Sequence, residues 1–258
     1  MTDSNVFELL RLWTRRELKV RYAGSWAGML WALFLPLAYI GLFYFVFAVV
    51  LKIRIPELEL KNGYFLYLLA GLLPWFGLSE GIGRAAQSLV AHESLLQKVV
   101  IPLWIFPTAA VLAAFLSQLF GMLILGMLLG WYAVLTPHAM LWLPLVLICQ
   151  LAVSLGLGWI LAGLTLGLRD LGQLVPIGLQ FLFYATPILY PRSLVPLPYR
   201  EWLIFNPFAV LTDAYHAVLL GFSWPPQSLV ALLVWSALLG SGGWWLFRRF
   251  EVVLRDWL

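Results

Sequence analysis

The chain has 258 residues, of which 63% are hydrophobic and only 11% are charged, and its formal net charge is +4. About a quarter of the residues are charged in a typical soluble domain, so this composition excludes an ordinary soluble protein. The 16 lysines and arginines lie at the ends of apolar segments and not in one patch, which argues against nucleic-acid binding. The single cysteine, Cys149, excludes an intrachain disulfide. We expect one all-α polytopic membrane domain over residues 1–258, without a cleavable signal peptide.

Residues 1–25 predict an amphipathic interface helix. Asn5 and Glu8 have the spacing of a capping box. At 100° per residue the apolar side chains fall on one face and the basic ones on the opposite face. The apolar face comprises Val6, Leu9, Leu10, Trp13 and Val20, and the basic face comprises Arg11, Arg15 and Lys19. Such a helix lies along a membrane surface. A further role in docking a partner stays open.

Six apolar segments predict six transmembrane helices. A hydrocarbon core about 30 Å thick requires roughly 20 apolar residues of helix. The clearest signal is Val99 to Leu168, a run of 70 residues without Asp, Glu, Lys or Arg, which suits two crossings with a turn at Pro137. Glu80 and Arg84, at i and i+4, can pair at one span end. The predicted spans are 26–51 (with a kink at Pro36), 64–84, 107–132, 140–167, 171–190 and 227–247. An exposed loop is expected at 52–62, a polar helical segment at 85–98 and a charged tail at 248–258.

Residues 191–224, which we call the gate segment, are expected to dip into the outer leaflet and return rather than to form a further span. Residues 202–222 are apolar enough to cross, but Asp213 would then sit in hydrocarbon, where an acid costs about 3 kcal/mol. We expect two short re-entrant helices broken at Asn206-Pro207, with Asn206 as N-cap and Pro207 at the first helical position. Irregular backbone at membrane depth persists only where protein or a water-filled cavity covers it. This gate segment, with Asn206, Pro207 and Asp213, therefore lines or covers a cavity.

The distribution of basic residues predicts the orientation. With six spans, 11 of the lysines and arginines fall on the side of the N-terminus and 5 on the other side. Because the basic side is cytoplasmic, both termini are expected in the cytoplasm and the gate segment outside.

The chain carries no recognisable chemistry of its own. It has no GxxxxGK[ST] loop, no HExxH and no Cys/His metal spacing, so we expect no catalytic residue, no metal and no cofactor. Only Glu80 and Asp213 are candidate intramembrane acids, which argues against an ion-coupled transporter. If the protein does work, the energy must come from elsewhere.

Aromatic side chains crowd the spans. Lipid-facing rings at the interfaces explain most of them, but rings also stack on sugars, and both interpretations stay open. The candidates for a substrate channel are Trp31, Phe34, Tyr39, Tyr44, Trp75, Phe76, Phe183 and Tyr184. Glycine pairs at Gly77/Gly81, Gly126/Gly130 and Gly163/Gly167 favour ordinary helix packing within the chain over a dimer seam.

Five stretches in order resemble one protein family over nearly the whole chain. They are LLRLWTRRELKVRYAGSWAGMLWALFLPL (9–37), AGLLPWFGLSEGIGR (70–84), LLQKVVIPLWIFP (95–107), LRDLGQLVPIGLQFLFYATPILY (168–190) and NPF (206–208). Together they are similar to the permease subunit of polysaccharide-exporting ABC transporters of the ABC-2 type, the O-antigen exporters in particular.

The resemblance implies a homodimer in the bacterial inner membrane that docks two copies of a cytosolic ATP-binding subunit. That partner would bind ATP and Mg²⁺, and the cargo would be an undecaprenyl-linked O-antigen polysaccharide. Capsule and teichoic-acid exporters share the plan. The residues that it places toward the ATPase are Arg15, Arg16, Glu17, Lys19, Arg21, Glu93, Gln97, Lys98, Arg169 and Asp170. Other cargo, such as a small lipophile, is one alternative. A membrane-embedded lipid-phosphate or glycan transferase and a structural partner without transport activity are the others.

Overall fold

The computed structural model describes residues 3–22, 30–53, 55, 58, 63–99, 101–134 and 137–256. Several predicted features lie outside the described residues or side chains: the side chains of Asn5, Arg21, Trp31 and Pro36, and most of the 52–62 loop. Within the described ranges all regular structure is helical, which confirms the all-α class.

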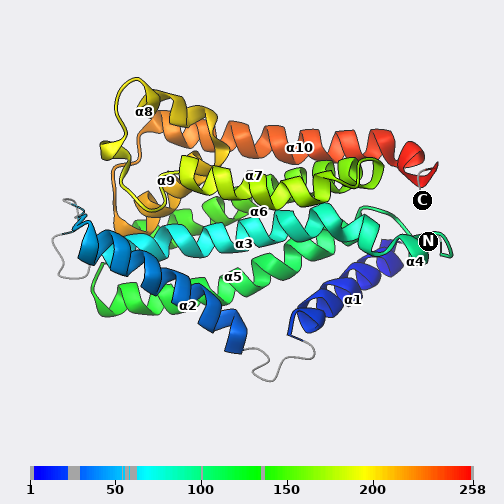
Figure 1. Ribbon diagram of the computed structural model, residues 1–258, viewed down its shortest axis with the longest axis horizontal. Coiled ribbons are helices and arrows are strands. Elements are labelled where there is room, and N and C mark those ends of the chain that lie inside the picture. Colours follow the sequence, from blue (N-terminus) through cyan, green and yellow to red (C-terminus); the bar gives the residue numbers. More distant parts are fainter. Residues whose placement is uncertain are drawn as a thin grey trace.

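Ten α-helices are described (Figure 1). They are α1 (Asp3–Tyr22), α2 (Leu30–Tyr44), α3 (Gly63–Ala91), α4 (Glu93–Leu96), α5 (Ile105–Trp131), α6 (Pro137–Gly167), α7 (Leu171–Ala185), α8 (Tyr199–Trp202), α9 (Pro207–Leu220) and α10 (Pro226–Asp256). A π-helical segment, η1 (Phe45–Val50), continues α2, and two 3₁₀ turns, η2 (Arg192–Leu194) and η3 (Leu203–Phe205), flank α8.

Four helices among the described residues are long and apolar enough to cross a membrane. They are α3, α5, the Leu141–Gly167 part of α6, and α10. With 27 to 31 residues each, at 1.5 Å per residue they exceed the roughly 30 Å of hydrocarbon. Two further apolar stretches are shorter, Leu37–Val50 and Leu171–Ala185. Six crossings therefore stay a prediction.

The helix ends differ from the predicted boundaries at four places. The span expected to reach residue 190 ends at Ala185, because Thr186 precedes a proline and adopts an extended backbone (φ −105°, ψ 135°). The charged tail is not separate, since α10 continues to Asp256. The first helix begins at Asp3, so Asn5 lies inside its first turn and not at the N-cap. Helix α3 likewise runs on from residue 84 to Ala91. Neither α3 nor α10 has a proline at its predicted end that would stop the helix there.

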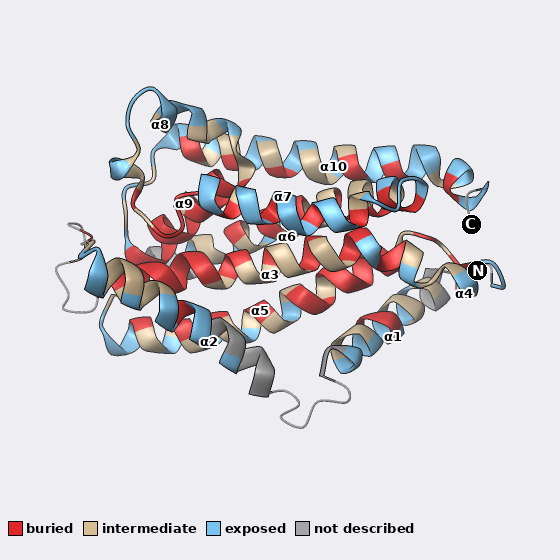
Figure 2. Ribbon diagram, viewed as in Figure 1, coloured by how far each residue is buried: buried red, intermediate tan, exposed pale blue. Residues whose placement is uncertain are grey.

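Helix α3 lies at the centre of the bundle. It contacts α2, α5, α6, α7 and α9, and Figure 2 shows it as the most continuously buried long helix. Leu66, Leu68 and Leu72 are fully buried in its first half. The outward faces of α2, α7 and α10 are apolar yet exposed, as expected for helices whose other contacts are lipid or protein.

Glycines set the closest helix crossings. A Cβ on Gly156 of α6 would overlap the carbonyl oxygen of Leu239 of α10, and one on Gly77 of α3 would overlap the Gln118 side chain of α5. Gly81 also faces α5. These glycines pack within the chain, as predicted for Gly77/Gly81. By contrast, no atom of the described residues lies within 4 Å of a Cβ at Gly126 or Gly130, so that pair makes no close helix contact with this part of the chain.

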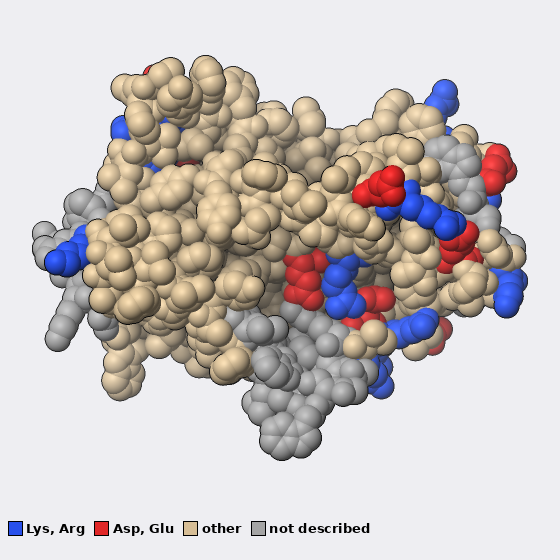
Figure 3. Space-filling model, viewed as in Figure 1, with Lys and Arg blue, Asp and Glu red and all other residues tan. Residues whose placement is uncertain are grey.

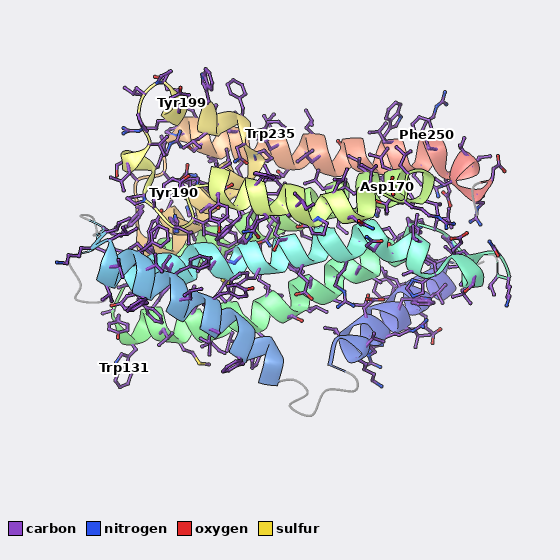
Figure 4. All side chains as sticks on the ribbon, in the orientation of Figure 1. Trp131, Asp170, Tyr190, Tyr199, Trp235 and Phe250 are labelled. Atoms are coloured by element: carbon purple, nitrogen blue, oxygen red, sulfur yellow. The ribbon has the colours of Figure 1, made fainter. Side chains whose placement is uncertain are left out.

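The two ends of the bundle differ in character. Both termini, α1 and α4 lie at one end (Figure 1), and charged side chains gather over this end and thin out across the middle (Figure 3). In Figure 4 Asp170 and Phe250 lie toward it, whereas Trp131, Tyr190 and Tyr199 lie at the other. We call these the charged end and the gate end. The hairpin of α5 and α6 thus returns to the end from which it started, as predicted.

Candidate functional site

At the charged end, two segments predicted to meet a partner are joined by an ion pair. The Nη2 atom of Arg169, in the turn between α6 and α7, lies 2.9 Å and 3.1 Å from the two carboxylate oxygens of Glu93 on α4. The two residues are 76 positions apart in sequence. The Arg169 side chain is 69% exposed and Glu93 is 25% exposed, so the pair is open to a partner. Asp170, beside Arg169, is also exposed.

The residues on either side of α4 contact neighbouring helices. The ring of the preceding residue, His92, packs edge-on against Trp13 of α1 and lies tilted against Phe106 of α5, with centroids 5.1 Å apart in both cases. On the other side Arg255 of α10 donates to the carbonyl oxygen of Ile101 at 3.0 Å. The two ends of the α4 segment are thus held by α1, α5 and α10.

Most of the exposed residues of this segment are polar. Ser94, Gln97, Lys98 and Val99 are exposed, while Leu96 points into the apolar cluster beneath. Gln97 and Lys98 are thus accessible in the same segment as Glu93, which the ion pair joins to Arg169. The role of these residues toward a partner stays a prediction.

Helix α1 turns its apolar face onto the protein itself. Trp13 is buried, and Val6, Leu9 and Leu10 pack on the same cluster. This apolar face is therefore covered by the chain rather than by lipid, and Val20 is exposed despite lying on the predicted face. The opposite face leaves Arg11, Arg15 and Lys19 exposed.

Two of the α1 residues that were predicted to face the ATPase have partners within the chain instead. Arg16 stacks over the Trp13 ring at 4.5 Å. Glu17 accepts from Arg84 of α3 at 2.5 Å, and Arg84 also lies 3.7 Å from Glu80. The predicted Glu80–Arg84 pair is present, but the shorter contact goes to α1. This Glu17–Arg84–Glu80 triad ties the interface helix to the central helix.

At the gate end the chain bends sharply at Asn206. The α8–η3 piece and α9 meet at 97°. The Asn206 side-chain oxygen accepts from the backbone N–H groups of Phe208 (3.0 Å) and Ala209 (3.3 Å), and Pro207 begins α9. The predicted N-cap and helix start are confirmed.

Arginines hold the rest of the gate segment. Arg192 donates to the Asp213 carboxylate at 2.6 Å and to the carbonyl oxygen of Arg200 at 3.1 Å. Arg200 in turn donates to the carbonyl oxygen of Val195 at 3.0 Å. Asp213 therefore has a cationic partner and is not an isolated acid.

Two tyrosines of α3 anchor the segment that follows α7. Tyr64 donates to the carbonyl oxygen of Leu189 at 2.6 Å, and Tyr67 bonds to those of Pro187 (3.1 Å) and Tyr190 (2.9 Å). The sequence analysis did not single out either tyrosine as a site residue. The signal was their position: two phenols one helical turn apart can both reach a non-helical TPILY stretch whose carbonyl groups need donors.

The candidate channel aromatics divide into two groups. Trp75 and Phe183 are 7% and 5% exposed and lie 5.6 Å apart inside the subunit. Phe34, Tyr39 and Tyr184 are exposed, and Tyr44 and Phe76 are half-buried. In this conformation the rings of α2 and the end of α7 are the ones that a cargo could reach from outside the subunit.

A buried polar network in the spans was not anticipated. Gln118 of α5 and Gln150 of α6 exchange amide hydrogen bonds at 2.9 Å and 2.6 Å, and the hydroxyl of Tyr215 of α9 bonds to Gln150. The signal in the sequence is two amides inside the 70-residue uncharged run, since polar groups within spans face the bundle interior.

Comparisons with known proteins cover most of the chain. The ABC-2 type transporter family matches residues 8–220. An O-antigen export system permease protein RfbA of Myxococcus xanthus is 34% identical over 235 residues, covering 86% of this chain and 87% of that protein. A protein of the same name from Klebsiella pneumoniae is 31% identical over 205 residues, 79% of this chain and 77% of that protein. The polysialic acid transport protein KpsM of Escherichia coli is 25% identical over 213 residues, 80% of each.

Proposed function

Because this chain belongs to the ABC-2 type transporter family, we propose that it is the permease subunit of an ATP-driven exporter of lipid-linked O-antigen polysaccharide. The observation that carries the cargo assignment is the similarity at 31% and 34% identity to permeases named for O-antigen export. The mechanical part of the proposal rests on the paired, exposed segments at the charged end.

In this proposal the chain crosses the inner membrane six times. The four long apolar helices supply four crossings, α2 with η1 supplies the first, and α7 with the segment after it supplies the fifth. The charged end faces the cytoplasm, because basic residues concentrate on that side of bacterial membrane proteins. The gate segment then reaches the outer leaflet from the periplasmic side.

Coupling to the ATPase follows from the contacts of α4. Two ATP-binding subunits, with ATP and Mg²⁺, would dock on the surface formed by Glu93, Gln97, Lys98, Arg169 and Asp170. A push on α4 would reach α1 and α5 through His92, which packs on Trp13 and Phe106, and α10 through Ile101, which accepts from Arg255. The permease functions as a homodimer, and the spans of the two copies part to admit the glycan.

Capsular polysaccharide and teichoic acid are the nearest alternatives for the cargo. The capsule alternative is supported by KpsM, a polysialic acid transport protein, at 25% identity. The lower identity makes O-antigen the preferred cargo. The two kinds of cargo can be distinguished by the neighbouring ATPase gene. The question is whether its product has an additional glycan-binding domain.

The experiment that tests the function is reconstitution. The permease is co-purified with its ATPase subunit, placed in proteoliposomes, and assayed for ATP hydrolysis with and without lipid-linked O-antigen. We expect hydrolysis to rise with the glycan, and deletion in cells to remove surface glycan while lipid-linked polymer accumulates inside. A chain that recruits no ATPase, or a deletion that leaves surface glycan unchanged, would reject the proposal.

A charge-reversed variant tests the coupling surface separately. Glu93→Lys together with Lys98→Glu should lower glycan-stimulated hydrolysis and export while membrane insertion stays intact. The matched control is Lys52→Glu, a reversal at an exposed lysine of the gate end, which should leave coupling unchanged.

A charge swap then identifies what Glu93 contacts. Glu93→Arg with Arg169→Glu preserves the internal ion pair but reverses the surface seen by a partner. Restored export would mean that coupling requires the ion pair within the chain. Continued uncoupling would mean that the ATPase contacts these charges directly.

A further inference from the structure

Helix α9 is a buried part of the bundle and not a cover lying over it. Twelve of its 14 residues are buried, and it contacts α3, α6 and α10. Among hydrocarbon chains, apolar packing alone gives helices little preference for one position, because lipid tails are as apolar as leucine. Polar contacts between α9 and its neighbours therefore decide where the helix sits.

The first polar contact is Tyr215 with Gln150. The carbonyl oxygen of Pro74 can only accept, and it lies 3.3 Å from Nε2 of Gln150, which orients the amide. The Oε1 atom of Gln150 thus faces Tyr215 and accepts from its hydroxyl and from Nε2 of Gln118. Every donor and acceptor of the Gln150 amide has a partner. A fully satisfied buried network of this kind specifies one arrangement.

The second polar contact involves the neighbouring residue, His216. Its ring stacks on that of Tyr67, with centroids 3.9 Å apart and planes 21° apart, and its Nε2 lies 3.2 Å from the carbonyl oxygen of Tyr67. Through its hydroxyl, Tyr67 also holds the chain that leads from α7 into the gate segment. One residue of α3 thus contacts both α9 and the stretch that leads into the gate segment.

Glycines of α3 make room for both contacts. Without a side chain at Gly77, the amide of Gln118 can reach Gln150. A Cβ on Gly71 would stand 3.0 Å from Nε2 of His216. Helix α3 therefore has no side chain at the two positions where the Gln118 amide and the His216 ring lie against it.

The remaining polar contacts of this region lie at the gate segment itself. Asn206 donates to the hydroxyl of Thr186 at 3.2 Å, Asp213 pairs with Arg192, and Trp235 of α10 donates to the carbonyl oxygen of Ile204 at 3.0 Å. These hold the turns around α9. Among the described residues, Tyr215 and His216 hydrogen-bond the body of α9 to α6 and α3.

We propose that Tyr215 and His216 are the positioning residues of the gate: they fix α9 in one place in the bundle by bonding to Gln150 and Tyr67. The proposal rests on the proposed export function, because a gate that releases glycan must be held shut and then let go. Opening would then break these two contacts, while the Gln118–Gln150 pair keeps α5 and α6 together.

Hydrogen exchange in lipid nanodiscs, on the chain alone without ATPase or glycan, tests this directly. Tyr215→Phe removes one hydroxyl and keeps the ring. We expect amide exchange in α9 to rise about 3- to 20-fold, the range set by interhelical hydrogen bonds in membrane proteins, with α5 and α10 unchanged. The matched control, Tyr64→Phe, removes a hydroxyl that bonds Leu189 and not α9, and should leave α9 at the parent rate.

Two further variants separate positioning from general loosening. If Tyr215 acts through Gln150, adding Tyr215→Phe to Gln150→Met should change α9 exchange no further. His216→Phe keeps a ring on Tyr67, loses the nitrogen, and should add to Tyr215→Phe. Unchanged α9 exchange, or an equal rise in every helix, would overturn the proposal. The outcome is independent of whether the chain recruits an ATPase, so the two proposals fail separately.

Discussion

The Glu17–Arg84–Glu80 triad allows a quantitative test of how the interface helix is held. Arg84→Gln removes both ion pairs at once. The three side chains are 16% to 31% exposed, so they are neither fully solvated nor fully buried. A charged hydrogen bond is worth about 1.5–3 kcal/mol, and partial exposure reduces that here to about 1.4 kcal/mol.

Most of this energy should belong to one of the two contacts. Glu17 lies 2.5 Å from Arg84, whereas Glu80 lies 3.7 Å away on the same helix. An i,i+4 pair of the second kind contributes about 0.3–0.5 kcal/mol. Glu17→Gln should therefore loosen α1 nearly as much as Arg84→Gln, and Glu80→Gln at most about 2-fold.

The rate of trypsin cleavage measures how often α1 opens, because the helix carries exposed arginines and a lysine that are cut only when it opens. When opening is fast relative to cleavage, the cutting rate follows the open population. A loss of about 1.4 kcal/mol predicts about tenfold faster cleavage in α1, and the difference should shrink in 1 M salt. Equal rates for the Glu80 and Arg84 variants, or an unchanged rate for Arg84→Gln, would refute this account of the triad.

Three further substitutions test the packing. Trp13→Ala should cost about 3 kcal/mol, because a buried indole is lost from the cluster that carries α4, and thermal unfolding in detergent measures it. Gly156→Ala should prevent monodisperse purification, since its Cβ would overlap the carbonyl oxygen of Leu239; Gly126→Ala, with nothing within 4 Å, should purify normally and serves as the control. Asn206→Ala should lose about 1 kcal/mol of cap energy, seen as a lower midpoint in the same unfolding experiment.

The sequence predicted well wherever a local property decides the structure. Hydropathy identified the four long spans, since crossing lipid requires a long apolar helix whatever its neighbours are. The start of α9 was also predicted, because Pro207 and the Asn206 side chain act within a few residues. Helix ends were less reliable: Thr186 before a proline ends α7 early, a rule that the sequence contained but the hydropathy pattern concealed.

Only the tertiary structure decided which distant residues meet. Glu93 and Arg169, Glu17 and Arg84, and Gln150 and Tyr215 are 76, 67 and 65 positions apart. Their pairing depends on how the helices rotate and cross, and in a chain so uniformly apolar the pattern does not distinguish a face toward lipid from a face toward protein. That is why Trp75 and Tyr184 looked equivalent in sequence, although one is buried in the core and the other is exposed. The chemistry of a side chain decides whether it can lie in the membrane. Which residues it contacts is decided by how the helices cross, and glycines such as Gly156 set the closest crossings.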